Sequence, residues 1–304
     1  MTKTRRFAKD MTRAALAADT LALGVHWIYD PPRVAALFNL IQGPMEPQAD
    51  SHHRQAVKGD FTHFGDQIMT LLESVSDLKT FNLEDWADRW RLLFHNYKGY
   101  MDHATRDTLA NFAAGRPLAE AGSQSTDMAP AARLAPLYLV YGGDEGRLLT
   151  WAREQASLTT RHPLILELVE FWAAALHRAL EGEEIPAALA EAAEIHLRDG
   201  ELRRLYQAGL DSAGEADSTA VINRFGASCD AFKMFPGLIH LALRHSAQPR
   251  EAMIQSILGA GDNATRATLI GTLMAAGYGA SFMHPLWYEG VNRRARIEVY
   301  LANV

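Results

Sequence analysis

Apolar residues recur along the chain at the spacing of amphipathic helices. In segment 83–98, Trp86, Trp90 and Leu93 fall at positions i, i+4 and i+7, which is one face of a helix. Segment 163–180 is apolar nearly all round, which is typical of a helix packed in the middle of a domain. The same spacing predicts further helices over 5–23, 66–77, 102–114, 144–156, 185–197, 200–210, 229–245 and 249–258. Runs of alternating β-branched residues between tight turns are missing, so the pattern predicts an all-α fold.

A last predicted helix, from residue 263 to about 282, carries a row of small side chains. Ala267, Gly271, Ala275 and Gly279 repeat every four residues. Such a row lets a neighbouring helix backbone approach closely, although each glycine inside a helix costs about 1 kcal/mol relative to alanine. We therefore expect this helix to lie at the centre of the protein.

Nothing in the chain marks a boundary between domains. The sequence has no long linker rich in Pro, Gly or Ser, no low-complexity tract and no repeat. The polar segments 42–62 and 119–127 are predicted loops, and both are short enough to belong to one domain. The prediction is a single compact all-α domain over residues 1–304, an orthogonal helical bundle, although length alone would favour two domains of about 150 residues.

Composition and charge exclude several classes of protein. The 304 residues are 48% hydrophobic and 22% charged with a net charge of −6, which excludes a disordered chain and offers no basic surface for nucleic acid. The uncharged run 267–283 is shorter than the roughly 20 residues of a membrane span. The basic N-terminus lacks the apolar core of a signal peptide, and Cys229, the single cysteine, has no disulfide partner. We expect a soluble, cytoplasmic protein without nucleic-acid or membrane partners.

Two aspartates open predicted helices within unusually polar segments. Asp66 lies in HFGDQ at 63–67, and Asp262 lies in GAGDNATR at 259–266. Each carboxylate is explained by simple N-capping, because it accepts hydrogen bonds from the free amides of the first turn. The glycines around Asp262 also permit an unusual backbone, and a helix N-terminus attracts anions, so a ligand or metal site is the second interpretation. Residue types alone leave both open.

Other polar and aromatic residues have a structural and a functional interpretation as well. The polar loop 122–127 precedes a predicted helix that carries Arg133. This segment is either a capped helix with a surface arginine or a binding segment for sugar or phosphate. Trp27 in HWIYD and Trp287 in HPLWYEG are either lids on the core or rings that stack on a base or sugar. The pair at 52–53, two histidines, is predicted to be a solvated loop.

A cysteine nucleophile is disfavoured. Cys229 lies at a predicted helix start, but no histidine stands near it in the sequence. A free cysteine in such a position is usually buried and inert.

Taken in order, these segments resemble the ADP-ribosylglycohydrolase family, which also includes eye-lens crystallins. The similarity extends from about residue 7 to 289 and rests on six segments: Ala18-Asp19 with HWIYD, the GDQ helix start, SxSTDM followed by ARLAPL, LTTRHP, GAGDNATRA and HPLWYEG. The resemblance implies a compact, orthogonal all-α bundle, in agreement with the helical spacing. It also implies hydrolysis of ADP-ribose from modified arginine or serine, or of related N- and O-glycosides.

The family typically holds two Mg²⁺ ions between a Thr-Asp-Asp segment and an Asp-Thr-Asp-Thr segment, with the help of an N-terminal Glu. This chain departs from that pattern. Asp66 matches the second Asp of the first segment and Asp262 the first Asp of the second segment. Gly65 and Ala264 stand where their partner carboxylates would be, and His26 falls near the usual Glu. Five expected carboxylates are thus reduced to two.

Two carboxylates limit what the site holds. Mg²⁺ requires oxygen ligands in near-octahedral geometry, so we expect at most one Mg²⁺ ion, with Asp66, Asp262 and Thr265 as its ligands, or no metal. A set in which His26 or His63 joins the two aspartates would instead favour Zn²⁺ or another transition metal.

The resemblance supports two hypotheses about function. In the first, the protein hydrolyses an ADP-ribosyl or smaller ribosyl compound, and Asp66 and Asp262 meet across one hollow as the catalytic pair, one of them as general base. The predicted substrate-binding residues are His63, Gln67, Asp127, Arg133, Asn263, Trp27 and Trp287. In the second, the missing carboxylates mark a non-catalytic ADP-ribose-binding or structural protein, as in the crystallin branch.

Overall fold

The structure, a computed structural model, describes residues 2–38 and 43–304. These residues form α-helices and short 3-10 turns, with no strand among them, so the all-α prediction is confirmed. Gln42, the first residue of the predicted loop 42–62, lies outside the described residues. The elements are α1 (Lys3–Leu23), α2 (Pro31–Leu37), α3 (His63–Leu78), α4 (Leu83–His95), α5 (His103–Ala113), α6 (Leu118–Ala121), α7 (Ala129–Ala132), η1 (Ala135–Leu139), α8 (Glu145–Ser157), α9 (Pro163–Glu181), α10 (Ile185–His196), α11 (Gly200–Ser212), α12 (Ser218–Phe225), α13 (Ala231–Arg244), α14 (Pro249–Leu258), α15 (Asn263–Tyr278), η2 (Ala280–Phe282), α16 (Pro285–Glu289) and α17 (Arg294–Asn303).

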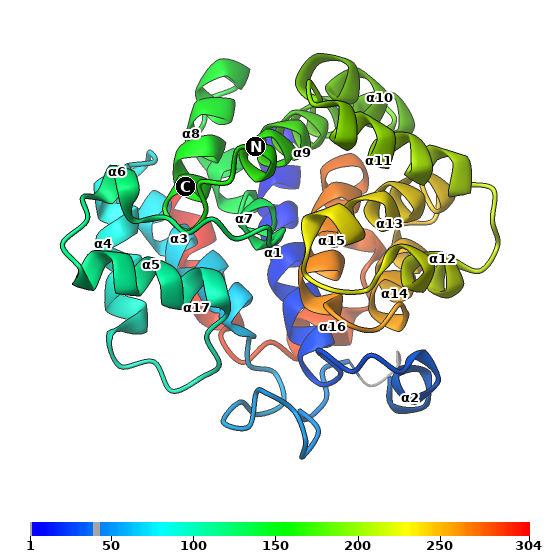
Figure 1. Cartoon of the computed structure of the whole chain (residues 1–304), viewed down its shortest axis with the longest axis horizontal. Coiled ribbons are helices and arrows are strands. Elements are labelled where there is room, and N and C mark those ends of the chain that lie inside the picture. Colours follow the sequence, from blue (N-terminus) through cyan, green and yellow to red (C-terminus); the bar gives the residue numbers. More distant parts are fainter. Residues whose placement is uncertain (1, 39–42) are drawn as a thin grey trace.

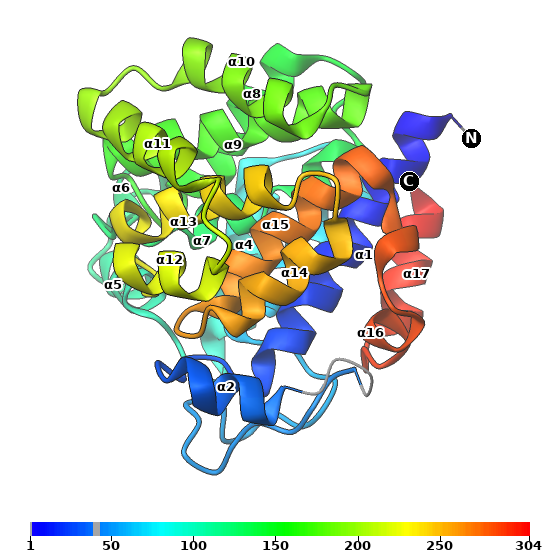
Figure 2. The same ribbon diagram turned by 90° about the vertical axis from the view of Figure 1, so that its right-hand side faces the viewer.

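Helices α1 and α15 pack side by side through the middle of the molecule (Figures 1 and 2). Their contact is close because both helices present small residues. A Cβ added at Gly271 of α15 would lie 3.4 Å from Ala18 Cβ and 3.5 Å from the Ala14 carbonyl of α1. The row of small side chains therefore brings two backbones together at the centre, as predicted.

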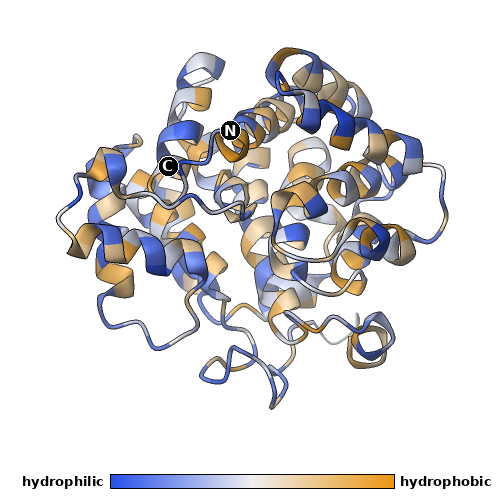
Figure 3. Cartoon of the chain, viewed as in Figure 1, coloured by the Kyte–Doolittle hydropathy of each residue, from blue (hydrophilic) through white to orange (hydrophobic). Residues whose placement is uncertain are grey.

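The other helices surround this pair and share one hydrophobic core, which extends from Phe7 in α1 to Leu301 in α17. Helix α9, predicted to lie inside the domain, packs against α8, α10 and α15. Polar residues gather on the exposed face of peripheral helix α11 (Figure 3). The result is a single compact domain. None of the helices in the described part of the chain is long and apolar enough to span a membrane.

Some helix limits follow the sequence pattern and others differ from it. Helix α14 occupies the predicted range, 249–258. Helix α15 ends at Tyr278, four residues early, because Gly279 takes a positive φ of 69° and the chain continues as η2. Elements α2, α12, α16 and α17 were not predicted; α2, α12 and α16 are short, and α17 has little contrast between its faces. The predicted loop 119–127 begins within one helical turn, α6.

Candidate functional site

Four loops are joined by backbone hydrogen bonds at the starts of α7, α13 and α15. The bonds run from N–H to C=O between Trp27 and Gly261 (2.9 Å), Gly261 and Ile28 (2.7 Å), Asp262 and Ala227 (2.7 Å), Ala231 and Thr126 (2.8 Å), and Met128 and Cys229 (3.1 Å). Four segments that are distant in sequence are thereby fixed relative to one another. Such a rigid set of loops is suited to positioning functional side chains.

The loop before α15 has the unusual backbone that its glycines suggested. Gly261 has a φ of 63°, and a Cβ there would lie 2.1 Å from the Ala227 carbonyl oxygen. Ala260 and Trp27 also have positive φ values, both 62°. A tryptophan in the left-handed region is strained, and such strain concentrates at functional sites. The strain fixes the Trp27 ring beside the cleft described next.

A cleft of about 300 Å³ opens where these loops meet, and we name it the aromatic cleft. Its walls include three aromatic rings and three carboxyl groups: Trp27, Tyr29, Tyr100, Asp102, Asp127 and Asp230. Asp102 and Asp230 are the N-caps of α5 and α13. Asp127 stands one residue before the N-cap of α7 and accepts a hydrogen bond from Ala129 N–H. Its volume is at the lower end of the range for small-molecule pockets.

The carboxyl groups at this cleft have opposed protonation tendencies. Burial raises the pKa of Asp127 well above its ordinary value, and the negative charges of Asp102 and Asp262 raise it further. Burial would also raise the pKa of Asp102, but its hydrogen bonds with His63 and the Thr105 backbone lower it to about 2. Asp127 is therefore the carboxyl group at this cleft whose surroundings most favour the protonated form, and those of Asp102 favour the ionised form.

Asp262 also acts electrostatically on Asp127, although the Asp262 side chain is fully buried. It caps α15 by accepting from Thr265 N–H at 3.1 Å, as predicted. Burial opposes ionisation, but the hydrogen bond from His26 outweighs it and lowers the pKa of Asp262. Its charge acts on Tyr29 and Cys229, which line the aromatic cleft, so it lies close behind the cleft wall.

A chain of two histidines supports Asp262. His26 Nε2 lies 3.0 Å from Asp262 Oδ1, and His26 Nδ1 lies 2.7 Å from His53 Nε2. Burial lowers the pKa of both imidazoles, that of His53 to about 2, where the neighbouring histidines add to the effect. Because the carboxylate only accepts, neutral His26 donates from Nε2 and accepts from His53 at Nδ1. The prediction of a solvated pair holds for His52 but is wrong for His53, which is 4% exposed.

Asp66 lies elsewhere, in a second cleft of about 220 Å³ that we name the Arg293 cleft. Its Oδ1 accepts from Arg293 Nη1 and its Oδ2 from the Tyr97 hydroxyl, both at 2.6 Å. The N-cap of α3 is Thr62, so the interpretation of Asp66 as a cap is wrong. Asp66 and Asp262 do not line a common described cleft, and their role as a catalytic pair stays a prediction.

The start of α3 is built around a buried carboxylate from α1. Asp19 accepts hydrogen bonds from Thr62 N–H (2.8 Å), the Thr62 hydroxyl (2.5 Å) and Gly65 N–H (3.2 Å). Burial raises the pKa of Asp19 to about 7, against the effect of these bonds. A Cβ at Gly65 would lie 2.3 Å from Asp19 Oδ2. Asp19 thus occupies the space that a side chain at position 65 would need.

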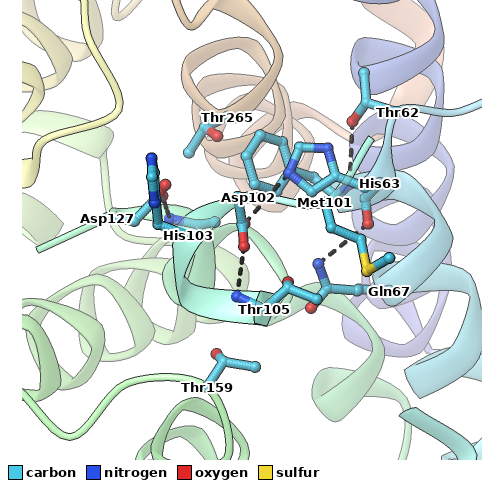
Figure 4. A network of polar contacts seen from close by, with 12 residues as sticks. Thr62, His63, Gln67, Met101, Asp102, His103, Thr105, Asp127, Thr159 and Thr265 are labelled. Atoms are coloured by element: carbon cyan, nitrogen blue, oxygen red, sulfur yellow. Dashed lines mark hydrogen bonds and ion pairs between the residues drawn. The ribbon is translucent and has the colours of Figure 1, made fainter. Parts of the chain in front are cut away.

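Two of the predicted substrate-binding residues, Trp27 and Asp127, line the aromatic cleft. The others are buried outside it. His63 binds Asp102 at 3.2 Å beside the start of α5 (Figure 4). Asn263 donates to two backbone carbonyls at 3.3 Å, and Trp287 is 1% exposed within α16.

Arg133 and Gln67 form a polar network behind the cleft. Arg133 donates to Gln67 (2.8 Å), Gln155 (3.1 Å) and Thr159 (2.7 Å), and its side chain is buried. Gln67 also accepts from Trp90 at 2.9 Å. The polar groups of these two residues contact each other and their neighbours in the network. These contacts hold α3, α7 and α8 together.

Sequence reasoning missed Asp102, Tyr29, Tyr100 and His53 as residues of the site. Asp102 had a usable signal, because it precedes a predicted helix as Asp262 does. Tyr29 stood within the HWIYD motif. His53 had no local signal, since its partner His26 is 27 residues away.

The donors expected for magnesium are only partly present. Asp262 Oδ2 and Thr265 Oγ1 are buried without a hydrogen-bond partner among the described residues. They would fill two of the six positions around Mg²⁺. Within residues 2–38 and 43–304, no group of three or more His, Cys, Asp and Glu is arranged to hold a metal ion. This donor set does not fit a two-ion centre.

Comparison with known proteins places the chain. The family model for ADP-ribosylglycohydrolase matches residues 2–304. Crystallin J1A of Tripedalia cystophora is 26% identical over 96% of this chain and 95% of the crystallin. Crystallin J1B of the same organism is 24% identical over 97% and 96%. A solved structure titled "ADP-ribosylglycohydrolase-related protein complex" has a similar fold, with a TM-score of 0.74 and 23% identity over 100% of this chain and 98% of that one. The chain is therefore a member of the ADP-ribosylglycohydrolase family.

Proposed function

We propose that the protein is a glycoside hydrolase that acts on an ADP-ribosylated or related ribosyl compound bound in the aromatic cleft. Family membership supports a glycosyl hydrolase type of function. One tendency carries the proposal further: burial and neighbouring charges favour the protonated form of Asp127, whereas hydrogen bonds favour the ionised forms of Asp102 and Asp262. Carboxyl groups whose pKa values are pushed apart are the pattern of an acid and a base in glycoside hydrolysis.

The role of each aspartate follows from whether its surroundings favour the protonated form and from whether one of its oxygens lacks a hydrogen-bond partner. Asp127 lines the cleft and would donate its proton to the leaving group as the glycosidic bond breaks. Asp262 Oδ2 is buried behind the cleft wall and has no partner among the described residues, so it would accept the proton of the attacking water through a second water. The hydrogen bond from His26 to Oδ1 keeps the carboxylate oriented and ionised.

The aromatic walls define where the ligand lies. The Trp27 ring stacks on His26 with centroids 4.1 Å apart and meets Tyr100 edge-on at 4.7 Å. A ring fixed in this way offers a face to a sugar or nucleobase. Tyr29, 57% exposed, stands at the mouth of the cleft. The ligand would lie between these rings and Asp127.

Variants of the acid and the base test this mechanism. Asp127→Asn and Asp262→Asn are each expected to lower turnover about 10²- to 10⁴-fold, the usual contribution of general acid–base catalysis. The panel is ADP-ribosyl-arginine, ADP-ribosyl-serine peptides and simple N-ribosides, with released ribosyl product measured by mass spectrometry. Asp230→Asn is the matched control, because Asp230 lines the same cleft but serves as the cap of α13. Full turnover in both Asp127→Asn and Asp262→Asn would refute the mechanism.

A second candidate function is favoured by the two crystallin relatives, which match the chain over almost its whole length. In this case the protein binds ADP-ribose or serves a structural role without catalysis. Calorimetric titration of the intact protein with ADP-ribose distinguishes a binding role from a structural role. Binding without turnover on the whole panel identifies a binding protein, and no binding at all identifies a structural one.

A further inference from the structure

We propose that this site operates without a divalent metal, because donors from His26, His63 and Arg293 already occupy the carboxylates that an ion would need. The proposal is independent of the proposed hydrolase activity, since metal binding is measured without turnover. It concerns three carboxylates, Asp262, Asp102 and Asp66, which are each held by a basic side chain.

At Asp262, His26, which falls near the position of the family's usual Glu, is itself unable to act as a ligand. Both ring nitrogens of His26 are used, Nε2 by Asp262 and Nδ1 by His53. Metal ligation requires an imidazole nitrogen with a free lone pair. The N–H that His26 directs at Asp262 takes one carboxylate oxygen, and only Asp262 Oδ2 and Thr265 Oγ1 remain without partners. Two oxygens are a small part of an octahedral shell.

At Asp66, both carboxylate oxygens are engaged. Arg293 takes Oδ1 and Tyr97 takes Oδ2, each at 2.6 Å. The guanidinium supplies the positive charge that a cation would otherwise supply. A second carboxylate at position 65 is sterically excluded, because Asp19 Oδ2 lies 2.3 Å from the place of its Cβ. The start of α3 therefore pairs with the guanidinium of Arg293 in the place of a metal ion.

At Asp102, the arrangement of Asp262 is repeated. Its Oδ2 lies 3.2 Å from His63 Nε2, and its Oδ1 accepts from Thr105 N–H at 2.6 Å. Figure 4 shows the imidazole and the carboxylate directed at each other. Two histidine–aspartate pairs and one arginine–aspartate pair thus do by hydrogen bonding what an ion does by coordination: they fix the carboxylates in place.

The direct test is a metal titration of the full-length wild-type protein after dialysis against EDTA. Calorimetry with MgCl₂, MnCl₂ and ZnCl₂ should detect no site tighter than millimolar, and about 10 mM MgCl₂ should shift the melting temperature by less than about 1 °C. One ion bound per chain and lost in Asp262→Asn would overturn the proposal. An ion that remains in Asp262→Asn but is lost in Asp102→Asn or Asp66→Asn would overturn it equally. An ion that remains in all three variants does not depend on these carboxylates and leaves the proposal standing.

A gain-of-binding variant sharpens the test. His26→Glu replaces the donor with an oxygen ligand next to Asp262 Oδ2 and Thr265 Oγ1, and we expect Mg²⁺ at about 10 mM to raise its melting temperature by several degrees. His26→Gln, which is of similar size but uncharged, should show no such shift. An equal response of His26→Gln and His26→Glu would count against the role assigned to His26. If His26→Glu does not fold, the wild-type titration still decides.

Discussion

Asp66 lies in the first turn of α3 and Asp262 is the N-cap of α15, but their surroundings differ in kind. Asp262 is fully buried, is bound by a neutral imidazole and keeps one oxygen free. Asp66 borders a cleft and is bound at both oxygens, by an arginine whose side chain is 43% exposed and by a tyrosine. The same residue type near two helix starts therefore keeps an unpartnered oxygen in one region and forms an ion pair in the other, and distant segments decide which.

The largest expected effect separates the two aspartates by activity. Asp262→Asn should lower kcat about 10²- to 10⁴-fold, because it removes the proposed base. Asp66→Asn should lower kcat less than about 10-fold, since both Asp66 oxygens serve structural contacts. Both variants are assayed on the same ribosyl substrate, and their melting curves verify folding. Equal, large losses in both would restore the catalytic pair expected from the sequence.

The second prediction concerns the packing around Asp19. Gly65→Ala should lower the free energy of unfolding by about 3 kcal/mol, because its methyl group would displace Asp19 from three hydrogen bonds. Gly277→Ala in α15 is the control: its nearest atoms lie 3.6 Å away, so it should be neutral or stabilising. Both are measured by urea unfolding. A tolerated Gly65→Ala would mean that α1 and α3 separate readily.

The third prediction uses the buried histidines. The folded pKa of His53, about 2, lies below the ordinary value of 6.5, so below pH 6.5 only the unfolded chain takes up this proton. The stability of the wild type relative to His53→Gln should then fall by about 1.4 kcal/mol per pH unit as the pH drops below about 6. Comparing the two proteins cancels the opposite trend from Asp19, whose pKa is raised to about 7. A pH-independent difference between pH 7 and 5 would contradict the buried, neutral state of His53.

These regions also show what local sequence pattern is able to predict. The spacing of apolar residues reports which face of a helix is buried, and it correctly predicted α14 and the close approach of α15 to α1. Capping is also local, so Asp262 as the N-cap of α15 was correctly interpreted. These features depend on neighbours within a few turns of the same helix.

The composition of the site depends on partners that are distant in sequence. Arg293 is 227 residues from Asp66, and Asp262 is 236 residues from His26. Nothing in the segment around His53 distinguishes a buried imidazole from a solvated one. The family resemblance identified the helix starts but not their new partners, because substitutions at 26 and 65 changed which groups meet.

The smallest expected effect tests the exposed half of the comparison. A double-mutant cycle between Arg293→Met and Asp66→Asn should give a coupling below about 1 kcal/mol that weakens further at high salt, because the pair is open to solvent on the arginine side. The matched control is Arg296 with Glu73, another pair between the end of the chain and α3, at 2.7 Å. Its arginine side chain is 58% exposed, so its coupling should be equal or smaller. A coupling of several kcal/mol for Arg293 and Asp66 would instead mean that this pair behaves as a buried one, and the two regions would then differ in chemistry but not in strength.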